Sequence, residues 1–396
     1  MYMKKKEKRF LRKELENVLT EFLKKNELYE SNDSESIRLE STDSLVLSND
    51  SLVLSTDSLV LSNDQEEVKE EEVSQNKLVK GEEGVKEEKP VIEHLVISGG
   101  GIIGFSEYGA LKQTNIDGRW HMDNIQSIYG TSIGSVLAVI ITLGYDWPTL
   151  DDFVVLRPWH HVFPIELNTI LSGIQNRGLF YRSHFDDVFK PLFSGKDLPL
   201  DITLEGYYEY TKGLLKDCTK DGTNCTKSGK GIDLHMFAVD VNAPYSVDVD
   251  FSYKTHPHMK LLDAVYASSS IPGIFSPLMT EDGACYMDGG IFKNYPLRAC
   301  ITGQKVDPRT ILGFKRCVEH AIQNQRITGL STLLDAVLLF IGKVGERINV
   351  LPELCEHIDN EVVIHAEPLN LASMLDVLKS AELRRSMIEK GAQLSL

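Results

Sequence analysis

Three short segments of this chain carry residue types suited to acyl transfer. They are 98–104 (Ser-Gly-Gly-Gly-Ile-Ile-Gly), 130–134 (Gly-Thr-Ser-Ile-Gly) and 288–290 (Asp-Gly-Gly). A serine in a tight turn can attack a carbonyl carbon, a carboxylate can accept the serine proton, and the amides of a glycine loop can stabilise the resulting oxyanion. The segments together therefore predict a serine hydrolase, and each of them needs an element that positions it.

The candidate nucleophile is Ser132, which lies between Gly130 and Gly134. The apolar run 125–129 precedes this turn and the apolar stretch 136–143 follows it, a pattern that predicts a strand, a tight turn and a helix. Glycines on both sides let the backbone tighten so that the hydroxyl projects from the turn. The N-terminus of the helix would then stabilise developing negative charge.

The glycine loop that follows the apolar segment 91–97 fits two interpretations. As an oxyanion hole it would use the amides of Gly99, Gly100, Gly101 and Gly104. As a G-x-G-x-x-G motif it would bind a dinucleotide, with Asp123 placed 19 residues beyond Gly104. A nucleophile-elbow pattern 28 residues after Gly104 favours the oxyanion hole, because a dinucleotide site does not require one.

The proton acceptor can be a carboxylate or a histidine. Asp288 follows the apolar pair Tyr286-Met287 and precedes Gly289 and Gly290, so a strand end could present its carboxylate to a cleft. An Asp-Gly hairpin turn would explain the same residues without catalysis. A Ser-His-Asp triad in the usual chain order would instead pair Asp288 with one of three later histidines, His320, His357 or His365.

Taken together, these segments resemble the patatin-like phospholipase family, whose members carry a glycine-rich oxyanion loop, a G-x-S-x-G elbow and a D-G-G or D-G-A motif. Two further segments extend the resemblance. Residues 264–275 are similar to the family's stretch before the aspartate, and Asn294-Tyr295-Pro296 is similar to the Asn-x-Pro after it. The resemblance covers roughly residues 94–318, without a detailed match over 146–231.

The resemblance implies a function and a role for each motif. It implies a lipid acyl hydrolase of phospholipase A or lysophospholipase type, acting on a lipid ester at a transient membrane contact. Ser132 would be the nucleophile, Asp288 the proton acceptor in a Ser-Asp dyad without histidine, and the amides around Gly100 and Gly101 the oxyanion hole. No metal or cofactor would be needed. A catalytically silent lipid-binding or scaffold protein on the same fold is the alternative.

One position departs from the family's usual pattern. Ile103 stands where members commonly carry Arg or Lys, just before the last glycine of the first motif. Stabilisation of the anion would therefore rest on backbone dipoles, and the preference for a lipid headgroup stays open.

Strands that alternate with helices from residue 91 onward predict a three-layer α/β/α domain with a mostly parallel central sheet. We expect this domain over 91–318, with 146–231 as an inserted or cap-like segment, and a helical region over 319–396 that packs on it. Ahead of the domain we expect a basic amphipathic helix over 1–30. A disordered linker over 31–90 would follow, holding a seven-residue Leu-Val-Leu repeat and a Glu/Lys-rich run.

Composition excludes several classes of function. The formal charge of −16 argues against nucleic-acid binding. No apolar run approaches the roughly 20 residues that span a bilayer, and no secretory signal is recognisable. Six cysteines without C-x-x-C spacing predict free thiols rather than a zinc site. We therefore expect an intracellular, cytoplasmic protein, with peripheral attachment to membranes and the oligomeric state left open.

Overall fold

The computed structural model describes one compact unit within residues 89–396, close to the boundary predicted near residue 90. The described residues are 90–218, 225–227, 229–245, 247–317, 325–329, 331–349, 358–366 and 371–394. The predicted N-terminal helix lies outside them, and so does the predicted linker apart from Pro90.

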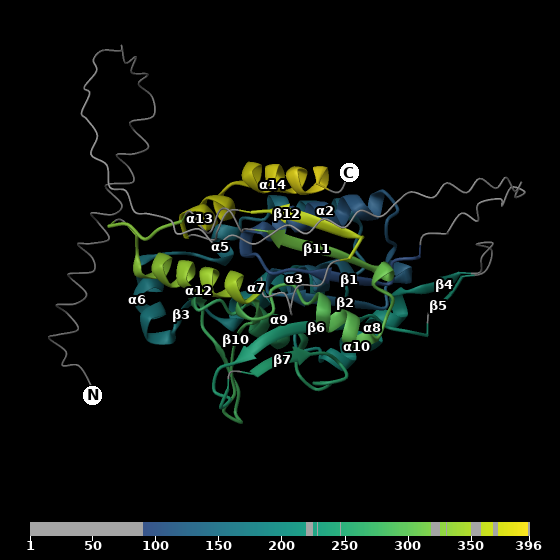
Figure 1. The fold of residues 1–396 in the computed structure, drawn as a ribbon, viewed down its shortest axis with the longest axis horizontal. Helices are drawn as coiled ribbons and strands as arrows, with labels where there is room; N and C mark the ends of the chain where they lie inside the picture. Colours follow the sequence, from purple (N-terminus) through teal and green to yellow (C-terminus); the bar gives the residue numbers. More distant parts are fainter. Residues whose placement is uncertain are drawn as a thin grey trace, which may run out of the picture. The chain divides into compact units, whose positions relative to one another are not determined.

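A mixed β-sheet forms the centre of this unit (Figure 1). Five neighbouring strands run parallel in the order β12 (Glu361–His365), β11 (Ile311–Cys317), β1 (His94–Ile97), β2 (Ser127–Thr131) and β6 (Asp233–Asp240). Three antiparallel strands continue the sheet from β6, namely β7 (Val247–Phe251), β10 (Cys285–Asp288) and β9 (Leu278–Met279). The mostly parallel sheet that the sequence predicts is confirmed.

Helices cover both faces of the sheet, as the alternation of side chains along β1 requires. Leu95 and Ile97 join the large core shared with α2 (Gly104–Ile116), α3 (Ile133–Thr142) and α9 (Leu261–Ser269). Val96 points to the other face and joins a smaller cluster with residues of α10 (Leu297–Gln304). The predicted three-layer α/β/α architecture is therefore confirmed.

The segment 146–231 supplies part of the main core. Its elements include α4 (Trp147–Asp151), α5 (Trp159–Val162), α6 (Leu167–Asn176), α7 (Arg182–Ser194), α8 (Leu204–Leu214), a π-helical turn (Asp152–Leu156), β3 (Gly178–Phe180), β4 (Lys216–Cys218) and β5 (Cys225–Lys227). Strand β3 pairs with β8 (Gly273–Phe275), and β4 pairs with β5. Phe180, Phe189 and Phe193 are buried in the same cluster as Leu95, so this inserted segment is bound to the sheet layers by shared packing.

The C-terminal region is not purely helical, which corrects the expectation for residues 319–396. Strand β12 pairs with β11 and extends the central sheet. Its Val362 and Ile364 are buried while Val363 and His365 are exposed, the period of two that marks a strand. A run of five residues between long helical patterns is too short for this period to stand out in the sequence.

Three helices accompany β12 in this region. They are α12 (Leu333–Asn349), α13 (Leu371–Lys379) and α14 (Ala381–Gln393). Helices α13 and α14 are separated at Ser380, whose Oγ caps α14 by accepting the Leu383 N–H at 3.1 Å. Helix α14 lies against α2 (Figure 1). A Cβ on Gly391 would lie only 1.9 Å from the Ser106 carbonyl oxygen, so glycine is required for this close approach. Among the described helices, none combines the length and apolar character needed to cross a bilayer.

Candidate active site

The carboxyl ends of several strands bring the predicted site residues together. Strands β11, β1 and β2 are parallel neighbours, so the glycine loop after β1 and Ser132 after β2 emerge at one edge of the sheet. Along β6, Thr131 at the end of β2 pairs with Phe237, and Asp288 at the end of β10 pairs with Ala238. Because these partners are consecutive, the ends of β2 and β10 meet, and Ser132 and Asp288 lie close together.

Ser132 occupies a strained turn between β2 and α3. Its backbone has φ 56° and ψ −123°, a conformation that residues with a Cβ rarely adopt and that is expected at a nucleophile elbow. A Cβ on Gly130 would lie 2.6 Å from the Gly134 carbonyl carbon, and a Cβ on Gly134 would lie 2.4 Å from the Ile97 carbonyl oxygen. Both flanking positions therefore need glycine for this turn to close.

Asp288 is a buried carboxyl group with an unused acceptor atom. Its Oδ1 accepts the Gly290 N–H at 2.7 Å, while Oδ2 is buried without a hydrogen-bond partner among the described residues. Burial raises the pKa of Asp288 to about 6, although contact with the Ser132 hydroxyl, the Gly290 N–H and the charge of Arg316 each lower it. The Ser132 hydroxyl therefore lies close enough to the Asp288 carboxyl group to affect its pKa. A carboxylate with a raised pKa is a better proton acceptor near neutral pH.

The four glycines assigned to the oxyanion hole divide into two pairs. The Gly99 amide donates to the Asn294 carbonyl at 3.0 Å, and the Gly104 amide donates to the carbonyls of Gly101 and Ile102. The amides of Gly100 and Gly101 donate to no group in the described part of the chain. Gly100 and Gly101 are therefore the two candidate hydrogen-bond donors to an oxyanion, because the amides of Gly99 and Gly104 already donate to carbonyl groups of the protein.

Gly99 and Gly104 have a steric role instead. A Cβ on Gly99 would lie 2.7 Å from Asn294 Oδ1 and 3.1 Å from Ser132 Cβ, and a Cβ on Gly104 would lie 2.2 Å from Ile133 Cγ1. These two positions let the loop lie directly against the elbow. The Asp288 segment is equally close-packed, because a Cβ on Gly289 would lie 2.3 Å from the Phe237 carbonyl oxygen.

Asn294 ties the glycine loop to the Asp288 segment. Its Nδ2 donates to the Gly99 carbonyl at 3.1 Å, while its own carbonyl accepts the Gly99 amide. This residue was absent from the predicted site, although its Asn-x-Pro segment stood out in the sequence. Nothing local to the sequence indicates that it pairs with a loop 195 positions away.

Two cavities meet at Ser132 and differ sharply in character. One, of about 180 Å³, is lined almost wholly by apolar side chains, among them Phe105, Val136, Phe153, Trp159, Phe163 and Phe275. The other, of about 100 Å³, is lined by polar groups of Asp288, Asn294, Arg316 and Glu346 beside apolar residues of α12. Gly101, Ser132 and Ile271 line both. Ser132, the candidate nucleophile, therefore lies where an apolar and a polar compartment join.

Aromatic residues near the start of the inserted segment differ in their relation to the apolar cavity. Trp159 and Phe163 are among its lining residues. Tyr145 and Trp147 have structural partners instead, since Tyr145 donates to the Leu192 carbonyl at 2.6 Å and Trp147 donates to Asn115 Oδ1 at 2.9 Å.

Of the residues required by the two competing interpretations, those that the structure describes lie away from both cavities. His365 is exposed on β12 and lines neither cavity, and His320 and His357 lie outside the described residues. Asp123 is exposed in a 3₁₀ turn (Met122–Asn124) and also lines neither cavity. Within the described ranges, no three His, Cys, Asp or Glu side chains are grouped to hold a metal ion.

A polar network beneath the glycine loop was not anticipated from the sequence. Ser98 Oγ donates to Glu107 Oε1 at 2.7 Å and accepts the Arg316 backbone N–H at 2.8 Å. Burial raises the pKa of Glu107 to about 8, so this carboxyl is largely protonated at neutral pH. The network joins the ends of β1 and β11, strands that are adjacent in the sheet but far apart in the chain.

Comparison with known proteins gives sequence relatives from two viruses. "Probable lipid hydrolase 463L" of Invertebrate iridescent virus 6 is 27% identical over 211 residues, covering 52% of this chain and 62% of that protein. "Uncharacterized protein R571" of Acanthamoeba polyphaga mimivirus is 30% identical over 207 residues, covering 52% and 60% respectively. The match thus spans about three fifths of the length of each relative.

A solved structure and a family model also match. The crystal structure of VipD from Legionella pneumophila aligns with a TM-score of 0.40 and 15% identity, covering 76% of this chain and 67% of that one. The family model "Patatin-like phospholipase" matches residues 95–301, which are more than half of the chain and hold the glycine loop, the elbow and the Asp288 segment. The chain therefore belongs to the patatin-like phospholipase family.

Proposed function

We propose that this protein is a lipid acyl hydrolase that cleaves carboxylic esters through an acyl-serine intermediate. The observation that carries the proposal is the position of Ser132, in a strained elbow beside a buried carboxyl group, where an apolar cavity meets a polar one. Membership of the family supports a lipid ester as the substrate. The activity would be of phospholipase A or lysophospholipase type, reached by transient contact with a lipid surface.

The first half of the reaction transfers the acyl group to the enzyme. Ser132 Oγ attacks the ester carbonyl carbon while its proton passes to the Asp288 carboxylate, and the carbonyl electrons move to an oxyanion. The free amides of Gly100 and Gly101, with the N-terminus of α3, would stabilise that charge. The intermediate then expels the alcohol, which takes the proton back from Asp288, and leaves an acyl-serine.

The second half returns the enzyme to its starting state. Water attacks the acyl-serine carbonyl and gives a proton to Asp288, and the same amides would stabilise the second oxyanion. Collapse breaks the bond to Ser132 Oγ, which recovers its proton, and the fatty acid leaves. Asp288 needs no histidine in this cycle because burial holds its pKa near 6, close enough to neutral pH for both directions of proton transfer.

The apolar cavity gives the acyl chain a place to bind. Its lining is contributed by α2, α3 and α13, by the inserted segment and by the segment 269–275. Burying each methylene of a chain there would contribute about 0.8 kcal/mol, the usual value for transfer out of water. A hydrocarbon chain thus supplies the binding energy that holds its ester beside Ser132.

Covalent labelling tests the nucleophile. A fluorophosphonate should label the wild-type protein on the peptide that contains Ser132, identified by mass spectrometry, and Ser132→Ala should abolish the labelling. Ser194→Ala, a change at an exposed serine on α7, is the matched control and should label like wild type. Vesicle binding without any labelling would contradict the proposal and favour a silent lipid-binding protein.

A further inference from the structure

We propose that Arg316 binds a phosphoryl group carried on the alcohol side of the ester, so that the site selects phosphate-bearing lipids over neutral glycerides. This inference rests on the proposed function, since it concerns the substrate of the same site. It assigns a specificity-determining role to a residue that no motif of the sequence contains.

The position of Arg316 places its guanidinium over the glycine loop. Its backbone N–H donates to Ser98 Oγ at the start of that loop, which fixes the end of β11 there. A Cβ on Gly100 would lie 3.1 Å from Arg316 Cδ, so the side chain runs directly across the loop. From there it lines the polar cavity together with Ser132 and Asp288.

Arg316 also supplies a charge that the glycine loop lacks. The two residues of the loop with large side chains are Ile102 and Ile103, and Arg316 is the one cationic residue among the described residues that line the polar cavity. Its charge lowers the pKa of Asp288 and of Glu107. An anion that enters this cavity therefore has a single cationic partner.

The guanidinium has unused hydrogen-bonding capacity. Its Nε is buried without a hydrogen-bond partner in the described part of the chain. Its Nη2 donates to Glu346 Oε1 on α12 at 3.3 Å, a long contact for an ion pair. A guanidinium offers five donors in a planar fork that matches two phosphoryl oxygens. A phosphoryl group would satisfy donors that the protein leaves open.

Each of the two cavities would hold one half of the substrate. Because Ser132 borders both, an acyl chain in the apolar cavity directs the scissile oxygen and the leaving alcohol into the polar one. Glu346 lines the same cavity, and its carboxylate repels a ligand that carries two negative charges. A phosphodiester, which carries one negative charge, therefore fits this cavity better than a free phosphate does. The chemistry at Arg316 thus favours a glycerophospholipid.

Matched substrates test this inference. Phosphatidylcholine and diacylglycerol with identical acyl chains are presented in the same detergent micelles, and fatty acid release is measured for wild type, Arg316→Gln and Arg316→Lys. Arg316→Gln should lower kcat/KM for phosphatidylcholine roughly 10- to 100-fold, mainly by raising KM. The same substitution should lower kcat/KM for diacylglycerol less than about threefold. Arg316→Lys should fall between them, because it keeps the charge but loses the fork. Arg309→Gln, at an exposed arginine bound to Asp307, is the control and should change neither.

The outcomes separate the inference from the proposed function. Equal loss on both lipids in a folded Arg316→Gln variant would overturn the inference alone, while absence of turnover on every ester by wild type would overturn both. Inhibition of diacylglycerol cleavage by inorganic phosphate, without any preference for phosphatidylcholine, would show a free-anion site and also contradict the inference. If Arg316→Gln does not fold, the Glu346→Gln variant tests the inference in its place. Removing the competing carboxylate should raise the phosphatidylcholine to diacylglycerol ratio about threefold, and an unchanged ratio would overturn the inference.

Discussion

At the scale of residues, the proposed reactivity of the site depends on the burial of one carboxyl group. Asp288 is 5% exposed, and its pKa rises to about 6 chiefly because burial penalises the charged form. The same burial leaves Oδ2 without a hydrogen-bond partner among the described residues. Asp288 is therefore a stronger base than an exposed aspartate while still ionised at neutral pH.

This raised pKa predicts how activity depends on pH. The reaction needs the carboxylate form, so kcat/KM on a soluble ester should rise about tenfold per pH unit below pH 6 and level off above it. A pH–rate profile of wild type, with the folded state followed by circular dichroism at each pH, measures this limb. A profile that stays flat down to pH 4.5 would contradict the role given to Asp288.

Substitution distinguishes a dyad from a triad. Asp288→Asn keeps the shape of the side chain but cannot accept the proton, so kcat should fall on the order of 10³-fold. His365→Ala should retain wild-type activity because His365 is exposed and lines neither cavity, and the same is expected of His320→Ala and His357→Ala. A comparable loss in any histidine variant that remains folded would favour a triad.

At the scale of elements, α3 begins directly after Ser132, the proposed nucleophile, and also forms a wall of the apolar cavity. Val136 lies one turn beyond Ser132 on α3 and lines that cavity. Helix and nucleophile are therefore a single unit, so a change in the helix surface should alter which chains fit without altering the chemistry.

A larger side chain at this position should shorten the preferred acyl chain. Val136→Phe fills space near the nucleophile, so kcat/KM for esters of 16-carbon acids should fall at least about tenfold relative to esters of 4-carbon acids. The measurement is a chain-length series of p-nitrophenyl esters. Val247→Phe, at an exposed position on β7, is the matched control. An unchanged chain-length profile in Val136→Phe would show that the acyl chain binds elsewhere.

The sequence predicts best those elements whose residue pattern lies within a short stretch of the chain. The elbow is visible because glycines flank Ser132 and apolar runs stand on both sides, and β2 and α3 form where these runs predict them. Strand β12 escaped prediction because only tertiary pairing with β11 distinguishes its five residues from the helices around them. Arg316 reaches the site through the adjacency of β11 and β1, which no local pattern encodes.

The same distinction applies within the glycine loop. Four glycines in the sequence look alike, but the Gly99 amide is occupied by Asn294, a residue 195 positions later. Sequence alone therefore identifies the loop, and only the folded chain shows which amides are free. Trp159 and Phe163 illustrate the converse, since they are at once packed in the core and part of the cavity lining.

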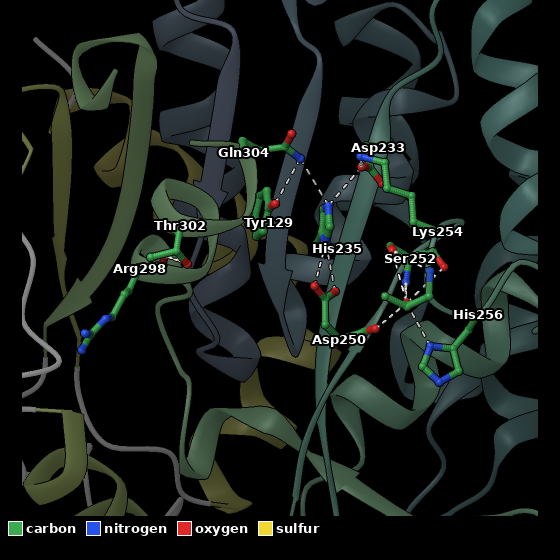
Figure 2. Close-up of polar contacts among 11 residues, drawn as sticks. Tyr129, Asp233, His235, Asp250, Ser252, Lys254, His256, Arg298, Thr302 and Gln304 are labelled. Carbon is green, nitrogen blue, oxygen red and sulfur yellow. Dashed lines mark hydrogen bonds and ion pairs between the residues drawn. The ribbon is translucent and has the colours of Figure 1, made fainter. Parts of the chain in front are cut away.

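At the scale of the whole molecule, the sheet carries a second cluster of charges on the face covered by α10. His235 on β6 stacks on Tyr129 of β2 with ring centroids 4.0 Å apart. It lies between two carboxylates, with Nδ1 at 2.8 Å from Asp250 Oδ2 and Nε2 at 3.2 Å from Asp233 Oδ2 (Figure 2). Lys254 Nζ approaches the same Asp233 oxygen at 2.7 Å. This cluster ties β2, β6 and β7 together away from the candidate site.

The cluster predicts that the fold loses stability at alkaline pH. Burial alone would lower the pKa of His235, but the two carboxylates outweigh it and raise the pKa to about 9. The stabilisation is therefore complete below the unfolded pKa of about 6.5 and is lost as pH rises through 9, on the order of 2–3 kcal/mol. Urea unfolding between pH 7 and 10 measures this loss, and His235→Gln should make the curve flatter. Equal pH dependence in wild type and His235→Gln would contradict the assignment.

The central claim is that Ser132 carries out hydrolysis of a lipid ester, and release of fatty acid from defined vesicles tests it most directly. Phospholipid and glyceride vesicles are incubated with wild type and with Ser132→Ala, with calcium chelated and the fold of both proteins checked by thermal unfolding. We predict that wild type releases fatty acid and that Ser132→Ala does not. Release at the wild-type rate by folded Ser132→Ala would contradict the account.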